Sequence, residues 1–132
     1  MKYFYLILTF LITLSCNSQK EKIDITTFDL SEIPESLYGC SCLFSNSKKE
    51  YDSEKYIYFD DFEDNCLISI DSKIVFLKPE EDKYKNENYT AYIQNKIQID
   101  EGYESTTYNA ELVLVDKKGN KQIYKVYGLC GC

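Results

Sequence analysis

The sequence predicts an all-β protein, a single small antiparallel meander closed as a barrel or sandwich of about six to eight strands. Three observations predict it. From Leu37 onward apolar residues alternate with polar ones, and aromatic and β-branched types dominate. Short turn sequences separate these segments. The first and last segments also carry matching Cys-x-Cys pairs. With 132 residues, the chain has room for one domain around one core.

Residues 1–15 are typical of a secretory signal peptide. The positively charged Lys2 precedes an apolar run of eleven residues, Phe4–Leu14. Eleven helical residues rise about 16 Å, half the thickness of a bilayer core, so the run suits the hydrophobic region of a signal rather than a membrane span. The mature protein is therefore expected outside the cytoplasm.

The run ends at Thr13-Leu14-Ser15-Cys16, and the polar Asn17 follows. This tetrapeptide resembles the lipobox of small bacterial lipoproteins, although threonine stands first where that pattern prefers leucine. The resemblance implies that Cys16 becomes the new N-terminus and carries diacylglycerol and palmitate, which would anchor the protein to a membrane. Asparagine rather than aspartate after the cysteine implies the outer membrane, with the domain in the periplasm.

The chain after the leader divides into a tether and one domain. Residues 16–25 are expected to form a lipidated tether, because lysine and glutamate alternate there without apolar periodicity. The β-domain is expected over residues 26–132. Its first segment, residues 29–37, contains Pro34 and predicts one short helical turn or an irregular loop.

The clearest strand pattern is YTAYIQNKIQI, residues 89–99, which predicts a half-buried antiparallel strand. One face would carry Tyr89, Ala91, Ile93, Asn95, Ile97 and Ile99, and the other Thr90, Tyr92, Gln94, Lys96 and Gln98. Tyr56 and Tyr58 could join Tyr92 in an exposed binding face if their strands are adjacent.

Turn residues predict the hairpins. Gly119-Asn120 supplies the positive φ that a tight hairpin needs, and Asp71-Ser72 joins two short apolar runs. An acidic loop, FDDFEDN, joins KYIYFDDF to CLISI. Residues 78–88 are charged and poor in apolar side chains, and they are expected to form a surface loop.

The charge and the missing residue types exclude several functions. The formal net charge is −7, and an acidic domain repels phosphate backbones, so nucleic acid is not an expected partner. The chain has no histidine, which excludes Ser-His, Cys-His and His-zinc chemistry. No cofactor is expected, and the protein is not expected to be an enzyme.

The four terminal cysteines predict a clasp between the first strand and the last. An antiparallel register that places Cys40 opposite Cys132 also places Cys42 opposite Cys130, because each pair of numbers has the same sum. An exported domain favours disulfides, and the outer one would close a loop of about 92 residues, worth about 4.6 kcal/mol.

Other interpretations of the cysteines stay open. Zinc or copper could bind through the alternative ligands Cys40, Cys42, Cys130 and Cys132. A redox pair within one Cys-x-Cys, or a different pairing that includes Cys66, is a further alternative. Cys66 itself alternates with Ile68 and Ile70, a pattern that favours a buried small apolar side chain.

The acidic loop could bind a cation. Its oxygen ligands would be Asp60, Asp61, Glu63 and Asp64. Phe62 occupies a position where a calcium loop places a ligand, and the glycine of such a loop is missing. A solvated acidic loop is therefore the favoured interpretation.

Together these features predict a membrane-anchored extracytoplasmic lipoprotein with a non-catalytic binding or structural role in the cell envelope. Its expected partners are the membrane, through lipid at Cys16, and an envelope protein or ligand that the sequence does not identify. The alternatives are metal binding, a carboxylate-dependent hydrolase and an envelope inhibitor. The inhibitor alternative is a likeness in size, fold class and acidity to the periplasmic lysozyme inhibitors, whose Ser-Gly loop motif this sequence lacks.

Overall fold

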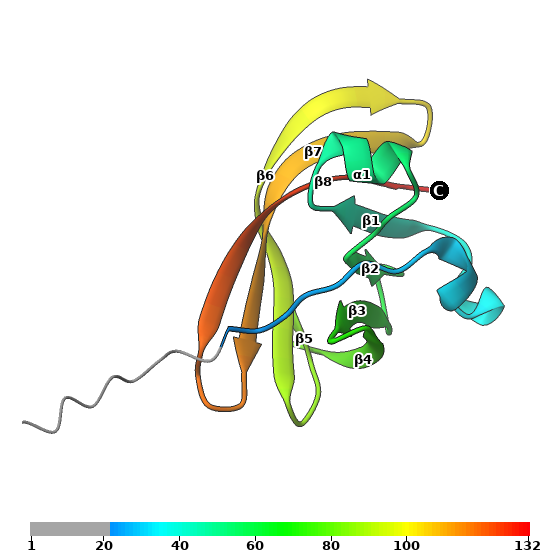
Figure 1. Cartoon of the computed structure of the whole chain (residues 1–132). Coiled ribbons are helices and arrows are strands. Elements are labelled where there is room, and N and C mark those ends of the chain that lie inside the picture. The colour runs from blue at the N-terminus through cyan, green and yellow to red at the C-terminus, as the bar shows by residue number, and fades with distance from the viewer. Residues whose placement is uncertain (1–21) are drawn as a thin grey trace, which may run out of the picture.

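The computed structural model describes residues 22–132, so the predicted signal peptide, the lipidation site at Cys16 and most of the tether lie outside the described residues. The predicted fold class is confirmed: eight antiparallel strands form a closed barrel in sequence order (Figure 1). Two 3-10 turns and one short helix complete the fold. The elements are η1 (Leu30–Glu32), η2 (Glu35–Leu37), β1 (Ser41–Ser45), α1 (Lys48–Asp52), β2 (Tyr58–Asp60), β3 (Cys66–Ile70), β4 (Lys73–Glu80), β5 (Lys83–Lys85), β6 (Tyr89–Gly102), β7 (Ser105–Asp116) and β8 (Lys121–Gly131).

The predicted clasp closes the barrel. β1 lies antiparallel to β8 with Cys42 opposite Cys130, and disulfides join Cys42 to Cys130 and Cys40 to Cys132. The Cα atoms of the bonded pairs are 4.1 Å and 4.0 Å apart, as in close, non-hydrogen-bonded antiparallel pairs. Because the four sulfurs are bonded to one another, they are not the thiolate ligands that the metal alternative requires.

A glycine lets β1 and β8 approach this closely. Gly128 lies opposite Phe44, and a Cβ at this glycine would lie 2.0 Å from the carbonyl oxygen of Leu43 and 2.6 Å from the Phe44 ring. No side chain fits at that distance, so the sheet can close here only around a glycine.

The N-terminal segment covers the outer face of the barrel and makes a second core. We call residues 23–40 the strap. Ile25 bridges Ile70 and Phe28 bridges Tyr56, so the tether predicted to reach residue 25 ends before Ile23, which is buried. Two cores result. Phe44, Tyr58, Ile68 and Leu112 pack inside the barrel, while Phe28, Ile33, Phe59 and Leu67 pack between the barrel and the strap.

Turn chemistry explains the hairpins. Asp71 and Ser72 both have positive φ, and the β3–β4 turn is the predicted two-residue connection. In the β7–β8 turn, Gly119 has a φ of 86°, and the Asp116 carboxylate accepts hydrogen bonds from the backbone N–H groups of Lys118 and Asn120.

The surface loop predicted over residues 78–88 is wrong. β4 extends to Glu80 and pairs with β5, with Pro79 opposite Tyr84. The segment lacks an apolar pattern because most of its side chains face solvent, yet backbone pairing needs no apolar side chain. Periodicity alone therefore missed this hairpin.

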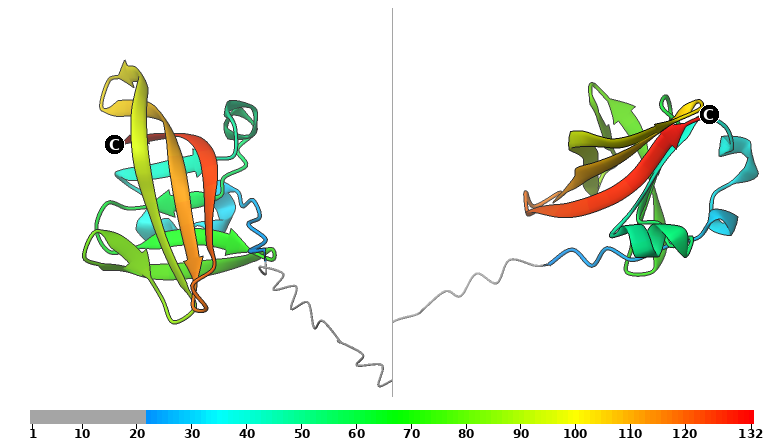
Figure 2. Two further views of the ribbon diagram at one scale, coloured as in Figure 1. Left: turned by 90° about the vertical axis from the view of Figure 1, so that its left-hand side faces the viewer. Right: turned by 90° about the horizontal axis from the view of Figure 1, so that it is seen from above.

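The predicted faces of β6 hold only for its first half. The pairing of β6 with β7 shifts between Gln94 and Ile97, and again between Gln98 and Asp100. Asn95 adopts a φ of 53° at the first shift, so one extra residue is inserted and the alternation changes phase. Ile97 is consequently 67% exposed rather than buried beside Ala91. The far half of this hairpin extends beyond the barrel body, and its tip lies beside the C-terminus (Figure 2).

Candidate functional site

The acidic loop after β2 is held by its own carboxylate. Asp61 accepts hydrogen bonds from the backbone N–H groups of Glu63, Asp64 and Asn65 at 3.1, 3.0 and 2.9 Å, and from the Asn65 amide at 2.7 Å. Partial burial would raise the pKa of Asp61, but these hydrogen bonds outweigh it and hold the pKa below its ordinary value. Asp61 thus organises the loop rather than projecting toward a ligand.

The neighbouring Asp60 faces the barrel interior instead. Its carboxylate accepts a hydrogen bond from the Tyr58 hydroxyl at 2.7 Å and one from the Phe62 backbone N–H at 3.0 Å. Burial raises the pKa of Asp60 above its ordinary value, against the opposing effect of these two hydrogen bonds. The predicted cation-loop carboxylates therefore point in different directions, and within residues 22–132 no group of three or more His, Cys, Asp or Glu side chains could hold a metal ion.

The remaining thiol lies inside the barrel. Cys66 is fully buried, as its alternation with Ile68 and Ile70 predicts. Burial raises the pKa of the Cys66 thiol, and the nearby charge of Asp60 raises it further. Both effects disfavour the thiolate, so this cysteine lacks the environment of a nucleophile.

The tyrosine face suggested by the sequence does not form. Tyr56 and Tyr58 are buried in the two cores. Tyr92 is half-buried on the outside of β6, where the ammonium of Lys83 lies 4.7 Å from the centre of its ring. These tyrosines serve packing rather than recognition.

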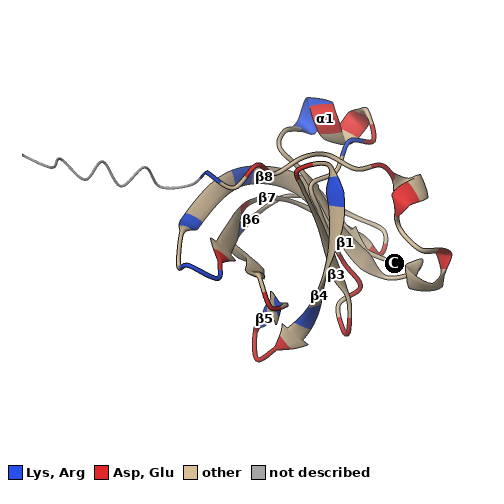
Figure 3. Ribbon diagram, turned by 60° about the horizontal axis from the view of Figure 1, so that its bottom comes forward, with Lys and Arg blue, Asp and Glu red and all other residues tan. Residues whose placement is uncertain are grey.

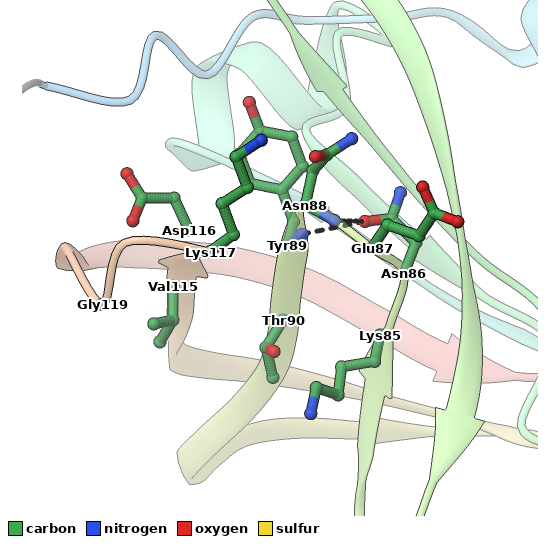
Figure 4. A pocket seen from close by; sticks show the side chains of 10 residues that line it. All are labelled: Lys85, Asn86, Glu87, Asn88, Tyr89, Thr90, Val115, Asp116, Lys117 and Gly119. Carbon is green, nitrogen blue, oxygen red and sulfur yellow. Dashed lines mark hydrogen bonds between the residues drawn. The ribbon is translucent and has the colours of Figure 1, made fainter.

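A polar pocket of about 360 Å³ opens between the β5–β6 and β7–β8 turns (Figure 4). The side-chain oxygen of Asn86 already accepts hydrogen bonds within the pocket, from the backbone N–H groups of Asn88 and Tyr89 at 2.8 Å. Tyr89 and Lys117 point to one side of this pocket and Lys85 to the other. The pocket is open to solvent. Its Asn86 and Asp116 side chains bond to the backbone of the turns, so the arrangement favours no particular ligand.

An apolar groove of about 310 Å³ lies between the strap and the outer face of β1 and β2. Leu30, Ile33 and Tyr38 line it from the strap, and Ser41, Leu43 and Phe59 from the strands. Ile33 and Phe59 are buried, whereas Leu30 and Tyr38 remain 40% and 57% exposed. The groove thus offers an accessible apolar lining above a packed base.

The elements that form this groove carry one sign of charge. No lysine or arginine occurs between Lys22 and Lys48, whereas the strap contributes carboxylates next to both 3-10 turns. Figure 3 colours the ribbon at acidic positions red, and several of these positions lie at the right of the view, beside the C-terminus. The carboxylates of the strap turns and of the loop after β2 are Asp29, Glu32, Glu35, Asp61, Glu63 and Asp64. We call the region formed by the strap turns, the groove and this loop the acidic end.

Sequence reasoning missed the groove because it forms only where the strap docks on the outer face of β1 and β2. The available signal was the stretch between Lys22 and Lys48, which contains no lysine or arginine but carries carboxylates and apolar side chains. Comparison with known protein families, curated proteins and solved structures finds no match. Across the described part of the chain, no helix is long and apolar enough to cross a membrane.

Proposed function

We propose that the protein is a lipid-anchored component of a bacterial cell envelope whose β-barrel binds a partner without catalysing a reaction. The observation that carries this proposal is the pair of disulfides between Cys40 and Cys132 and between Cys42 and Cys130. Disulfides persist in oxidising compartments and are rare in the cytosol, so they support the export that the leader predicts. The resemblance of Thr13-Leu14-Ser15-Cys16 to a lipobox supports the anchor.

The position of the chain start supports the same arrangement. The described chain begins on the opposite side of the barrel from the two 3-10 turns (Figure 1). An anchor at Cys16 would therefore hold the far side near the membrane and leave the acidic end free in the aqueous space. Residues 22–132 contain thirteen lysines and twenty-one Asp or Glu, a net charge of −8. Anionic lipids repel such a charge, which favours this orientation.

A non-catalytic role is supported by the carboxylates. Asp60 and Asp61 are the acids whose pKa values the fold shifts in the loop after β2, and both are engaged by structural hydrogen bonds. An acid–base pair needs groups that can reach a substrate. These two hold the loop and the barrel interior instead.

Lipid attachment is tested by metabolic labelling with a palmitate analogue in a bacterial host, followed by membrane fractionation. We expect label and membrane association in the wild-type chain and their loss in Cys16→Ala. Cys66→Ala is the matched control, because it also removes one free thiol and should keep both properties. Labelling of Cys16→Ala, or a soluble wild-type protein, would contradict the anchor.

Disulfides and metal are distinguished by intact mass after alkylation in denaturant. Without reductant only Cys66 should react among the five cysteines after Cys16, and all five should react after reduction. Alkylation of all five without reductant, together with bound metal in the native protein, would favour the thiolate site.

A further inference from the structure

The apolar groove under the strap has the features of a docking site. Its volume of about 310 Å³ is at the lower end for ligand sites, so it has room for one or two apolar side chains rather than a large cofactor. Leu30 and Tyr38 leave apolar surface in contact with water at its rim. A partner that covers this rim would bury apolar surface that folding leaves exposed, which favours binding.

We propose that this groove binds a segment of a partner polypeptide in which basic residues flank an apolar anchor side chain. The inference rests on the proposed binding role and names the site and the partner's chemistry. The apolar lining selects the anchor, and the carboxylates of the acidic end select the flanking charges. Complementary charge steers encounter and excludes wrong partners, while the buried anchor supplies affinity.

The carboxylates nearest the groove are held in place. In η1, Asp29 accepts a hydrogen bond from the Ser31 backbone N–H at 2.8 Å, and Glu32 accepts one from the Asp29 backbone N–H at 2.9 Å. This capping box fixes both side chains beside Leu30. Hydrogen bonds from Ser31 lower the pKa of Asp29, so it stays charged at neutral pH.

The charge also argues against two other occupants. A second copy of the chain would bring its own acidic end against this one, at a net charge of −8 for each set of residues 22–132. An anionic lipid surface would be repelled in the same way. The ammonium of Lys78 reaches the loop after β2, where it donates a hydrogen bond to the Asn65 side chain at 2.6 Å. This lysine therefore does not neutralise the carboxylates of the strap.

The test uses the full chain, purified in a non-ionic detergent, and three fluorescent pentapeptides, KKLKK, KKSKK and EELEE, capped at both ends. Fluorescence anisotropy at low and at physiological salt measures binding. We expect KKLKK to bind about tenfold more tightly than KKSKK, since one leucine anchor contributes an apolar contact of that size. EELEE should not bind, and the KKLKK affinity should fall with salt.

Variants locate the site. Ser41→Phe places an aromatic ring in the groove and should weaken KKLKK binding about tenfold or more, without changing KKSKK. Tyr38→Ser is a second variant of the groove lining and should also weaken KKLKK binding. It removes an exposed side chain at the rim, so it does not require the fold to accept a larger residue. Glu32→Gln with Glu35→Gln keeps an acceptor at the capping box and should weaken binding about threefold to tenfold. Glu81→Gln with Asp82→Asn, in the β4–β5 turn, is the matched charge control and should change nothing.

Several outcomes would overturn the proposal. Equal affinity for KKLKK and KKSKK would show a charge effect without a groove, and binding of EELEE would show non-selective adhesion. An equal loss in the β4–β5 control would show a long-range effect of net charge. Self-association that Ser41→Phe abolishes in sedimentation would assign the groove to a second copy. None of these outcomes affects palmitate labelling of Cys16, so failure here is distinguishable from failure of the anchor.

Discussion

β3 and the far half of β6 have similar sequences and opposite surroundings. Each contains two isoleucines separated by one polar residue, in CLISI and IQIDEG, yet every residue of β3 is buried and every residue of β6 from Asn95 onward is exposed. β3 has a neighbour on each edge and is covered on both faces. β6 pairs with β5 only at Thr90 and Ala91, so in the described chain its far half has a paired neighbour only in β7. The number of covering neighbours, rather than the residue pattern, decides burial.

The exposed edge of β6 is protected against pairing with other chains. Two register shifts interrupt it, and Lys96 places its ammonium 5.2 Å from the centre of the Tyr108 ring, which packs against the inner core. Bulges and inward-pointing charges are known ways to prevent edge-to-edge association. The register shifts of β6 therefore protect an exposed edge at which a regular strand such as β3 could pair with another chain.

The largest expected effect on stability comes from removing the two disulfides that join β1 to β8. Replacing Cys40, Cys42, Cys130 and Cys132 together by alanine should lower the free energy of unfolding by about 4.6 kcal/mol, the loop-closure value for about 92 residues. Removing only the Cys40–Cys132 bridge should have a much smaller effect, because the remaining bridge still closes a loop of 88 residues. Urea denaturation measures both. Equal losses from the two bridges that add up to the whole would contradict nested closure.

The next effect compares the two isoleucine patterns directly. Ile68→Ala opens a cavity in the inner core and should reduce the free energy of unfolding by about 2–5 kcal/mol. Ile97→Ala, at 67% exposure, should stay within about 0.5 kcal/mol of wild type. Urea midpoints with unchanged slopes measure the difference. Similar losses at the two positions would mean that the β6 hairpin is covered in solution.

A smaller effect tests the bulge in β6. Asn95→Val places a branched side chain at a φ of 53° and should destabilise the protein by about 1–2 kcal/mol more than Asn95→Gly. Both variants lose the hydrogen bond from the Asn95 amide to Glu111, so their difference isolates the backbone conformation. Equal unfolding free energies would show that β6 can change register without strain.

The smallest expected effect is a change of stability with pH that depends on Asp60 at the end of β2. Burial raises the pKa of Asp60 in the folded protein, so the folded carboxyl keeps its proton to a higher pH than the unfolded one. Its contribution to stability is therefore present at low pH and lost as the pH rises through the folded pKa. Asp60→Asn should improve in unfolding free energy relative to wild type as the pH rises through and above the ordinary carboxyl value of 3.8. A pH-independent difference between the two proteins would show that folding does not shift the pKa of Asp60.

Local signals predicted most of the fold. The two-residue repeat placed the strands, Asp71-Ser72 and Gly119-Asn120 placed two hairpins, and the matched Cys-x-Cys spacing gave the correct disulfide register. The β4–β5 hairpin was missed because most of its side chains face solvent and carry no apolar pattern. The groove was missed because its lining requires the strap to dock on β1 and β2, which no local pattern reports.

The sequence by itself determined the meander order, two of the hairpin turns and the clasp, because side-chain period, turn φ and antiparallel register depend on a few neighbouring residues. Only the tertiary structure decided which faces are covered. The strap made a second core from Phe28 and Ile33, and the bulge at Asn95 turned Ile97 outward. Both results depend on contacts between distant segments, where burial is settled by what packs on a face rather than by the residues that form it.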